Sequence, residues 1–477
     1  MRIDKKNQTI FIYTLVVLFN IVSVGTNLSY LFSIPQLCIV LYQLLKGDLK
    51  KATFYNLLFF MTSISTNMMA ASNLIDNTMA ASNYTYGNLR FLGPIRWTYA
   101  VSIIILVTLL FQKKKMCRGI FLFKIYQSLL RLAVIAFSFG VVGILFDDNY
   151  SFDSFYSYLI YIFILLVNLA VILLQHDRAV VEVYYHHSVY VLQAVVFGTL
   201  LSFLFFNTQS FYGGMESIFT PDILGLGPLL LISIFYCKCD LMLVVSLISF
   251  FYISTISLGG KGVFTVASIV LIFAYLLFFY FDSSKIKYIK RLRIITLFSV
   301  FVIFSLSLTF GDLVIAKTYQ ALSIFSGDIS TIANSPAIRI AETLNIFDSS
   351  SSNPITLLFG KGYGGYYTDS LGLFSILDIS HDAFSDQEIS SGVFTTAHDT
   401  FATVPLFHGI YGLFIIFSIC FNGIKKVREN FLYATIIPWI VFMFYFSTLF
   451  AAAGVFFMYG AEFRPIKNYI DRKENEE

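Results

Sequence analysis

Long runs of apolar residues recur along most of this chain, and polar residues gather in the short connections between them. Most runs are about 17 to 25 residues long, the length of a helix that crosses the hydrocarbon core of a bilayer. We predict spans at 10–27, 28–45, 52–70, 95–111, 120–146, 154–175, 188–206, 222–237, 241–258, 262–281, 293–311, 403–421, 431–447 and 448–461. The last two could instead form one long helix or a tight hairpin.

Backbone groups in hydrocarbon must find partners within their own segment, and the runs lack the alternation of a β-barrel. The pattern therefore predicts an all-α polytopic membrane protein with about 14 transmembrane helices. Composition agrees, since 57% of residues are hydrophobic, only 13% are charged and the mean hydropathy is +0.76. A soluble domain carries about 25% charged residues. No cleavage site follows the first run, so we expect it to remain as a helix.

Basic residues occur in alternate connections, which sets the expected orientation. They are Arg2, Lys5 and Lys6; Lys46, Lys50 and Lys51; Lys113, Lys114, Lys115 and Arg118; Lys285, Lys287, Lys290, Arg291 and Arg293; and Lys425, Lys426 and Arg428. The intervening connections 147–153 and 207–221 contain no lysine or arginine. Because basic loops stay on the cytoplasmic side, we expect both termini to be cytoplasmic. The net charge of +4 mainly reflects these loops, and we expect no nucleic-acid partner.

One outer connection, residues 312–402, is much longer than the rest and holds three basic and ten acidic residues. Connections of this length are usually functional. Ser335-Pro336 favours a helix start, after which one face is apolar and the other polar. The apolar face comprises Ala337, Ile340, Leu344 and Phe347, and the polar face comprises Arg339, Glu342 and Thr343. The predicted organisation is transmembrane helices in 1–311, an outer subdomain in 312–402, C-terminal transmembrane helices in 403–461 and a cytoplasmic tail in 462–477.

Three positions on the predicted outer side could carry chemistry. His398 precedes the span 403–421 and is followed at spacings of eleven and fourteen by Gly409 and Gly412. It could anchor a helix end at the interface, or exchange a proton near neutral pH. Arg339 could form a surface ion pair with Glu342 one turn away, or bind an anion through its guanidinium.

Lys261, in SLGGKGVF (257–264), is a cation at the outer boundary, where it could snorkel from a tight turn or bind phosphate beside a helix start. The glycine-rich LFGKGYGG (358–365) is predicted to be a flexible turn, because it lacks the spacing of a phosphate loop. Arg90 and Arg131 are accessory candidates, the second because a charge inside a span is costly. The Cys237 and Cys239 pair has no metal-site spacing, and we expect no metal and no other cofactor.

These motifs, in chain order, resemble the O-antigen polymerase and O-antigen ligase superfamily. AHDTFATVPLFHGIYG (397–412) is similar to the family's His-initiated helix with a G-x-x-G pair, with Asp399 at the usual asparagine position. NPITLLFGKGYG (353–364) looks like its N-P-x-x-G-x-G-x-G turn with an insertion. SLGGKG (257–262) looks like its S-R-G helix opening, with lysine in place of arginine. The motifs cover roughly residues 240–460.

The resemblance implies a metal-independent membrane glycosyltransferase with a GT-C-like helical bundle in the bacterial inner membrane. Its donor and acceptor would be oligosaccharides on undecaprenyl pyrophosphate, bound at the periplasmic face, and a chain-length regulator protein is a possible partner. His398 would activate the acceptor hydroxyl, and Asp399 would orient His398 or the acceptor. Lys261 and Arg339 would bind the pyrophosphate.

Polymerase activity is the favoured interpretation within the family, and a ligase that transfers glycan to lipid A core is the alternative. A flippase for the same lipid-linked sugars belongs to a different class, which predicts repeated halves and midplane charges. Arg131 is the one clear midplane charge, and no matching half is present. A structural subunit without chemistry would leave the acidic outer segment and the position of His398 unexplained.

Overall fold

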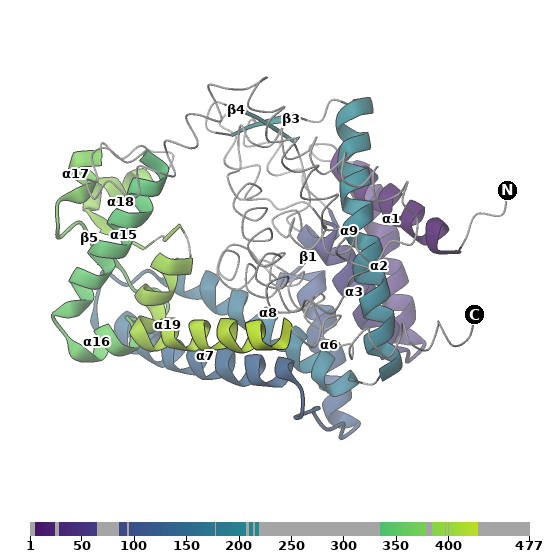
Figure 1. The fold of residues 1–477 in the computed structure, drawn as a ribbon, viewed down its shortest axis with the longest axis horizontal. Helices are drawn as coiled ribbons and strands as arrows, with labels where there is room; N and C mark the ends of the chain where they lie inside the picture. The colour runs from purple at the N-terminus through teal and green to yellow at the C-terminus, as the bar shows by residue number, and fades with distance from the viewer. Residues whose placement is uncertain are drawn as a thin grey trace, which may run out of the picture.

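A computed structural model of the chain describes residues 5–23, 28–63, 85–92, 95–176, 178–206, 209–212, 215–218, 334–377, 384–395, 397–398 and 400–427. These parts are mostly helical (Figure 1). The helices are α1 (Lys5–Val22), α2 (Leu28–Leu45), α3 (Leu49–Met61), the 3-10 helix η1 (Tyr86–Asn88), α6 (Trp97–Phe111), α7 (Phe121–Phe146), α8 (Phe152–Gln175), α9 (Arg178–Phe206), α15 (Asn334–Ser351), α16 (Pro354–Phe359), α17 (Leu373–Leu377), α18 (Asp386–Ser391) and α19 (Thr400–Val427).

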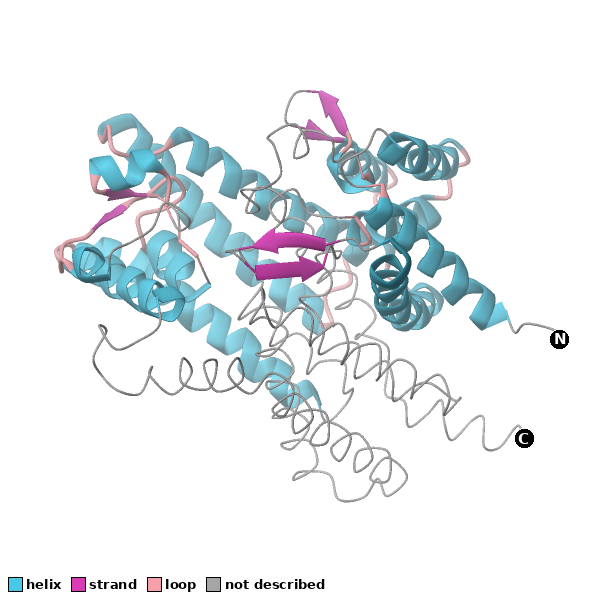
Figure 2. Ribbon diagram, turned by 90° about the horizontal axis from the view of Figure 1, so that it is seen from above, coloured by secondary structure: helices cyan, strands magenta, loops and turns pink. Residues whose placement is uncertain are grey.

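Strands are few and short in the described ranges. They are β1 (Arg90–Leu92), β2 (Ile95–Arg96), β3 (Gln209–Tyr212), β4 (Met215–Ile218), β5 (Tyr367–Thr368) and β6 (Val393–Phe394). They form three antiparallel pairs, β1 with β2, β3 with β4 and β5 with β6. Figure 2 shows the β5–β6 ladder among the short helices at one side of the molecule.

Within the described residues, four helices, α2, α7, α8 and α19, are long and apolar enough to cross a membrane. Every predicted span that falls on described residues coincides with or overlaps a helix, and α2 has the predicted bounds 28–45. The predicted spans between 222 and 311 and between 431 and 461 lie outside the described residues. The chain is thus a mostly helical protein with membrane-length helices. The total of 14 transmembrane helices and the GT-C-like arrangement stay predictions.

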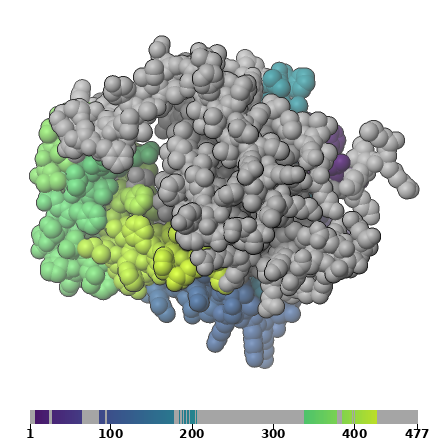
Figure 3. Space-filling model, viewed as in Figure 1, coloured from purple at the N-terminus to yellow at the C-terminus, as the bar shows by residue number. Residues whose placement is uncertain are grey.

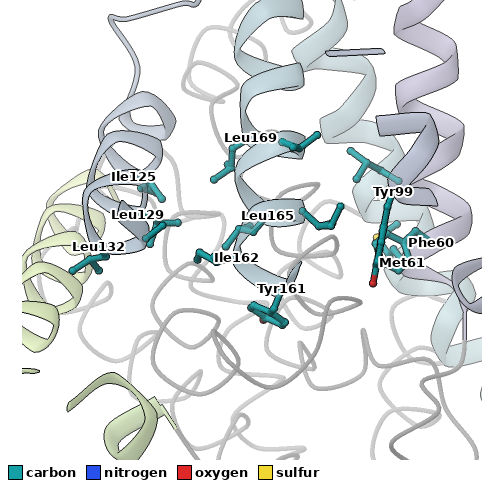
Figure 4. Packing of buried hydrophobic residues seen from close by; sticks show 14 of the residues in the cluster. Phe60, Met61, Tyr99, Ile125, Leu129, Leu132, Tyr161, Ile162, Leu165 and Leu169 are labelled. Atoms are coloured by element: carbon teal, nitrogen blue, oxygen red, sulfur yellow. The ribbon is translucent and has the colours of Figure 1, made fainter. Parts of the chain in front are cut away.

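Helix α8 is at the centre of the packed apolar interior. Its buried residues Ile162, Leu165 and Leu169 lie between α7 and α6, and Figure 4 shows them among side chains from the neighbouring helices. The opposing surface of α7 contributes Ile125, Leu129 and Leu132, all buried. Since α8 contacts neighbours on several sides, it buries more of its surface than α2 or α7.

A buried hydrogen-bond network joins α8 to three other elements. The Tyr86 hydroxyl donates to Asn56 Oδ1 (2.6 Å), and Asn56 Nδ2 donates to the Ser102 hydroxyl (2.9 Å). Ser102 in turn donates to Asn168 Oδ1 (2.9 Å). Because buried polar groups need partners, this network fixes how η1, α3, α6 and α8 fit together.

The described residues between 334 and 398 form a polar subdomain, comprising α15–α18 with β5 and β6, at one end of α7, α8 and α19 (Figure 1). The predicted helix after Ser335 is present as α15, but its buried face differs from the predicted apolar one. Glu342 is 0% exposed, whereas Leu344 is 43% exposed. The assignment of Glu342 to a polar surface is wrong because the carboxylate has protein partners that make its burial tolerable.

The glycine-rich turn 360–365 is tightly packed, contrary to the prediction that it is flexible. The backbone N–H of Lys361 donates to Leu406 O on α19 (2.7 Å), and that of Tyr363 donates to Ala136 O on α7 (3.0 Å). Gly360, Gly362 and Gly364 all have positive φ and lie against the backbone of α19, of α7 and of the α7–α8 connection, respectively. Only glycine combines this conformation with so close an approach.

Helix α19 is broken where it meets this turn. Gly409 has φ 61° and ψ −159°, so the segments before and after it are two helices joined at a kink. A Cβ at Gly409 would lie 2.5 Å from Gly360 N. The turn supplies partners for backbone groups that the break exposes, and this makes irregular backbone tolerable inside a membrane-length helix.

We expect Gly362→Ala to destabilise the protein much more than Gly372→Ala. Both glycines have positive φ, so both substitutions carry a backbone strain of about 1–2 kcal/mol. A Cβ at Gly362 would also overlap the backbone of Gly140 and Ala136, whereas a Cβ at Gly372 meets nothing within 4 Å. The measurement is the thermal unfolding midpoint of the purified variants in detergent. Equal midpoints would contradict the tight packing of the turn.

Candidate functional site

His398 lies two residues before α19 and contacts a carboxylate of the polar subdomain. Its Nδ1 contacts Oε1 of Glu342 on α15, and its backbone N–H donates to Glu342 Oε2 (3.3 Å). The Glu342 side chain is fully buried, whereas the His398 side chain is 28% exposed. The pair therefore combines a shielded carboxylate with an imidazole that solvent can reach.

A second side chain, that of Tyr367, binds the Glu342 carboxylate. The Tyr367 hydroxyl on β5 donates to Glu342 Oε1 (3.3 Å). Burial raises the pKa of Tyr367 well above its usual value, and the negative charge of Glu342 raises it further. Tyr367 thus keeps its proton as a donor, and Glu342 accepts from three groups that stabilise its negative charge.

The polar subdomain holds this pair through a second buried carboxylate, Glu388. Glu388 Oε2 accepts from the hydroxyl (2.9 Å) and the backbone N–H (3.1 Å) of Ser385. The Glu388 N–H donates back to the Ser385 hydroxyl oxygen (3.3 Å), which completes the capping box that starts α18. Its Oε1 accepts from the backbone N–H (2.9 Å) and hydroxyl of Thr395. These bonds fix the segment leading to His398, whose ring lies edge-on to Phe384 with centroids 5.1 Å apart.

The contact with Glu342 determines which nitrogen of His398 is basic. A carboxylate accepts a hydrogen bond, so the geometry assigns the proton to Nδ1 and leaves Nε2 as the basic nitrogen. When Nε2 takes a proton, the nearby carboxylate stabilises the imidazolium that forms. The arrangement is that of a general acid–base pair, with Glu342 as the residue that orients His398.

Arg339 lies one turn before Glu342 but forms no ion pair with it. Its side chain is exposed, and no side-chain partner for its guanidinium occurs in the described parts of the chain. The interpretation of an Arg339–Glu342 surface pair is therefore wrong, because Glu342 points into the protein toward His398. An exposed guanidinium of this kind can bind an anion through two parallel N–H donors.

Arg339 also borders a groove between α15 and the start of α19. The groove has a volume of about 270 Å³ and is lined by Arg339, Ile340, Thr343, Leu344 and Phe401. Its surface is mostly apolar, with one cation at its edge. Arg339 lies three residues before Glu342, and Phe401 lies three residues after His398. The groove and the His398–Glu342 pair are therefore built from neighbouring residues of the same two segments.

Of the other predicted site residues, Arg90 and Arg131 have no contact with this pair in the described ranges. Lys261 and Asp399 lie outside the described residues. Arg90 is exposed on the β1–β2 hairpin opposite Arg96, which donates to Gly87 O (3.1 Å). Arg131 is exposed in the middle of α7, without a side-chain partner in the described ranges.

Sequence reasoning missed Glu342 as the partner of His398, and it missed Tyr367, which donates to Glu342. Glu342 was overlooked because a helix-face argument ranks residues by polarity and places every carboxylate outside. Tyr367 has no motif that distinguishes it. A usable signal was that Glu342 is one of only a few acidic residues within a predicted amphipathic helix. Comparisons of the chain with protein-family models, curated proteins and solved structures find no match.

We expect His398→Gln and Glu342→Gln to be energetically coupled. Each change removes the same charge-assisted contact, so their effects on unfolding should be non-additive, by about 0.5–3 kcal/mol. The measurement is a double-mutant cycle of detergent-purified protein. The matched control pairs Glu342→Gln with Arg339→Gln, one turn away without an ion pair, and should be nearly additive. Additivity in the first cycle would show that His398 and Glu342 do not interact.

Proposed function

We propose that this chain is an integral-membrane glycosyltransferase that polymerises a surface polysaccharide. It would transfer glycan from undecaprenyl pyrophosphate to a sugar hydroxyl of another lipid-linked repeat unit. The observation that carries the proposal is the His398–Glu342 pair, a partly exposed imidazole on a buried carboxylate at the head of a membrane-length helix. A substrate with a lipid tail and a polar head requires a site at such a boundary.

The chemistry needs a base and a cation. His398 Nε2 takes the proton of the acceptor hydroxyl while its oxygen attacks the anomeric carbon, and Glu342 stabilises the resulting imidazolium. The bond from the anomeric carbon to the pyrophosphate oxygen breaks, and its electron pair leaves with the lipid pyrophosphate. The exposed Arg339 would neutralise the charge that develops there. Lys261 is the second cation that the sequence resemblance implies.

We further propose that the site faces the periplasm and that the protein lies in the inner membrane with both termini in the cytoplasm. The acidic α7–α8 connection contacts the glycine turn and the residue that follows it. Tyr150 donates to Lys361 O (2.8 Å), and Tyr366 donates to Asp147 Oδ2 (3.0 Å). Two segments predicted to be on the outer side thus meet at one end of the helices. This supports a common side for them.

We expect His398→Ala and Arg339→Ala to abolish long glycans. A strain lacking this chain would express each variant, and the surface polysaccharide would be separated on a gel. Losing the base lowers turnover by about 10²–10⁴-fold, so only single repeat units on the lipid A core should remain. Asp348→Asn, an exposed change on the same helix α15, is the control and should restore the full ladder at equal membrane expression.

Other outcomes would change the assignment. Polymer that accumulates on undecaprenyl pyrophosphate and is absent from the core would identify a ligase. Single repeat units that never reach the outer face would indicate a flippase. A normal ladder from both variants would show that His398 and Arg339 do not carry the chemistry.

A further inference from the structure

Two basic loops that are far apart in the sequence meet at the end of α8 that is remote from the candidate site. The first loop, residues 46–51, comprises the α2–α3 connection and the first turn of α3. It is hydrogen-bonded to this end of α8 through Gln175 Nε2, which donates to Leu49 O (3.2 Å). The α6–α7 connection reaches the same turn of α8, since the Cys117 N–H donates to Leu173 O (3.0 Å). The end of α8 thus brings the two loops together.

The two loops form what we call the basic rim. It comprises Lys46, Lys50, Lys51, Lys113, Lys114, Lys115 and Arg118, all exposed. Asp48 is the one acidic residue in the two loops, and it pairs with Lys51 at 3.1 Å. In Figure 3 the blue part of the chain, which includes α6, α7 and their connection, projects from the lower edge of the molecule.

Large apolar side chains border the basic rim. Leu45 is 89% exposed and Phe111 is 84% exposed, and each ends the helix that leads into one of the loops. Tyr42 is 56% exposed, and Lys46 Nζ lies 5.3 Å from its ring centroid. Cations beside exposed apolar and aromatic side chains match a membrane interface, where headgroups carry charge and acyl chains begin.

The position of the rim fits the same interface. Helix α8 has 24 residues, so at 1.5 Å per residue its two ends are about 36 Å apart. This exceeds the hydrocarbon core of about 30 Å, so both ends can reach headgroups. The far end carries Asp147, Asp148 and Asp153, so the charge changes sign along the helix.

We propose that the basic rim binds the headgroups of anionic phospholipids. The negative phosphates would lie among lysines of both loops, and the acyl chains would lie against Leu45 and Phe111. Free phosphate offers the same charge but no acyl chain, so the exposed apolar border favours a lipid. This inference does not depend on the proposed glycosyl transfer.

The test is thermal unfolding of the delipidated full chain in detergent, titrated with dioleoylphosphatidylglycerol or dioleoylphosphatidylcholine. The wild type should be stabilised by the anionic lipid at lower concentration. Two double variants each remove two lysines from one loop: Lys114→Gln/Lys115→Gln and Lys46→Gln/Lys50→Gln. Each should weaken the apparent affinity for the anionic lipid about thirtyfold, because each lysine contributes about fivefold. The control is Lys425→Gln/Lys426→Gln, an adjacent pair at the end of α19, which should leave the affinity for the anionic lipid unchanged.

Three results would overturn the proposal. Equal stabilisation by both lipids would show that headgroup charge is not recognised. An equal loss in all three double variants would indicate diffuse attraction rather than a site shared by two loops. Stabilisation by inorganic phosphate at the same concentrations would show that the acyl chains contribute nothing.

Discussion

Every buried backbone group in a membrane-length helix needs a partner, and this constraint governs how the polar subdomain attaches to the helices. At the break in α19 the carbonyl of Leu406 accepts from Lys361 of the glycine turn. On the other side of the turn, the carbonyl of Ala136 accepts from Tyr363. The turn is therefore part of the interior of the protein rather than a hinge above it.

This attachment places the His398–Glu342 pair. The first segment of α19 is held at Leu406 by the turn, and Phe407 packs edge-on against Tyr158 of α8 with centroids 4.4 Å apart. His398 precedes this fixed segment, and Glu342 is fixed by its own burial in α15. A pair assembled from elements that are themselves anchored keeps its geometry without support from the substrate.

Sequence patterns predicted the helices well because length and apolarity are properties of the local chain, as in α2 and α8. The sequence also predicted that His398 directly precedes a membrane-length helix. The partner of His398, Glu342, was not predicted, because burial of a carboxylate depends on donors that arrive from Tyr367 and His398, distant in the sequence. The glycine turn was misjudged for a related reason, since glycine permits close packing as readily as flexibility.

The groove beside Arg339 relates these features to the kind of molecule that the site could hold. Its lining residues come from α15 in the polar subdomain and from Phe401 at the start of a membrane-length helix. An apolar groove favours a hydrophobic chain, and one guanidinium at its edge favours a phosphate attached to that chain. His398 lies close in the sequence to Phe401, the groove residue on α19. The His398–Glu342 pair, the Arg339 guanidinium and the apolar groove thus share α15 and the start of α19, as the proposed transfer from a lipid-linked sugar would require.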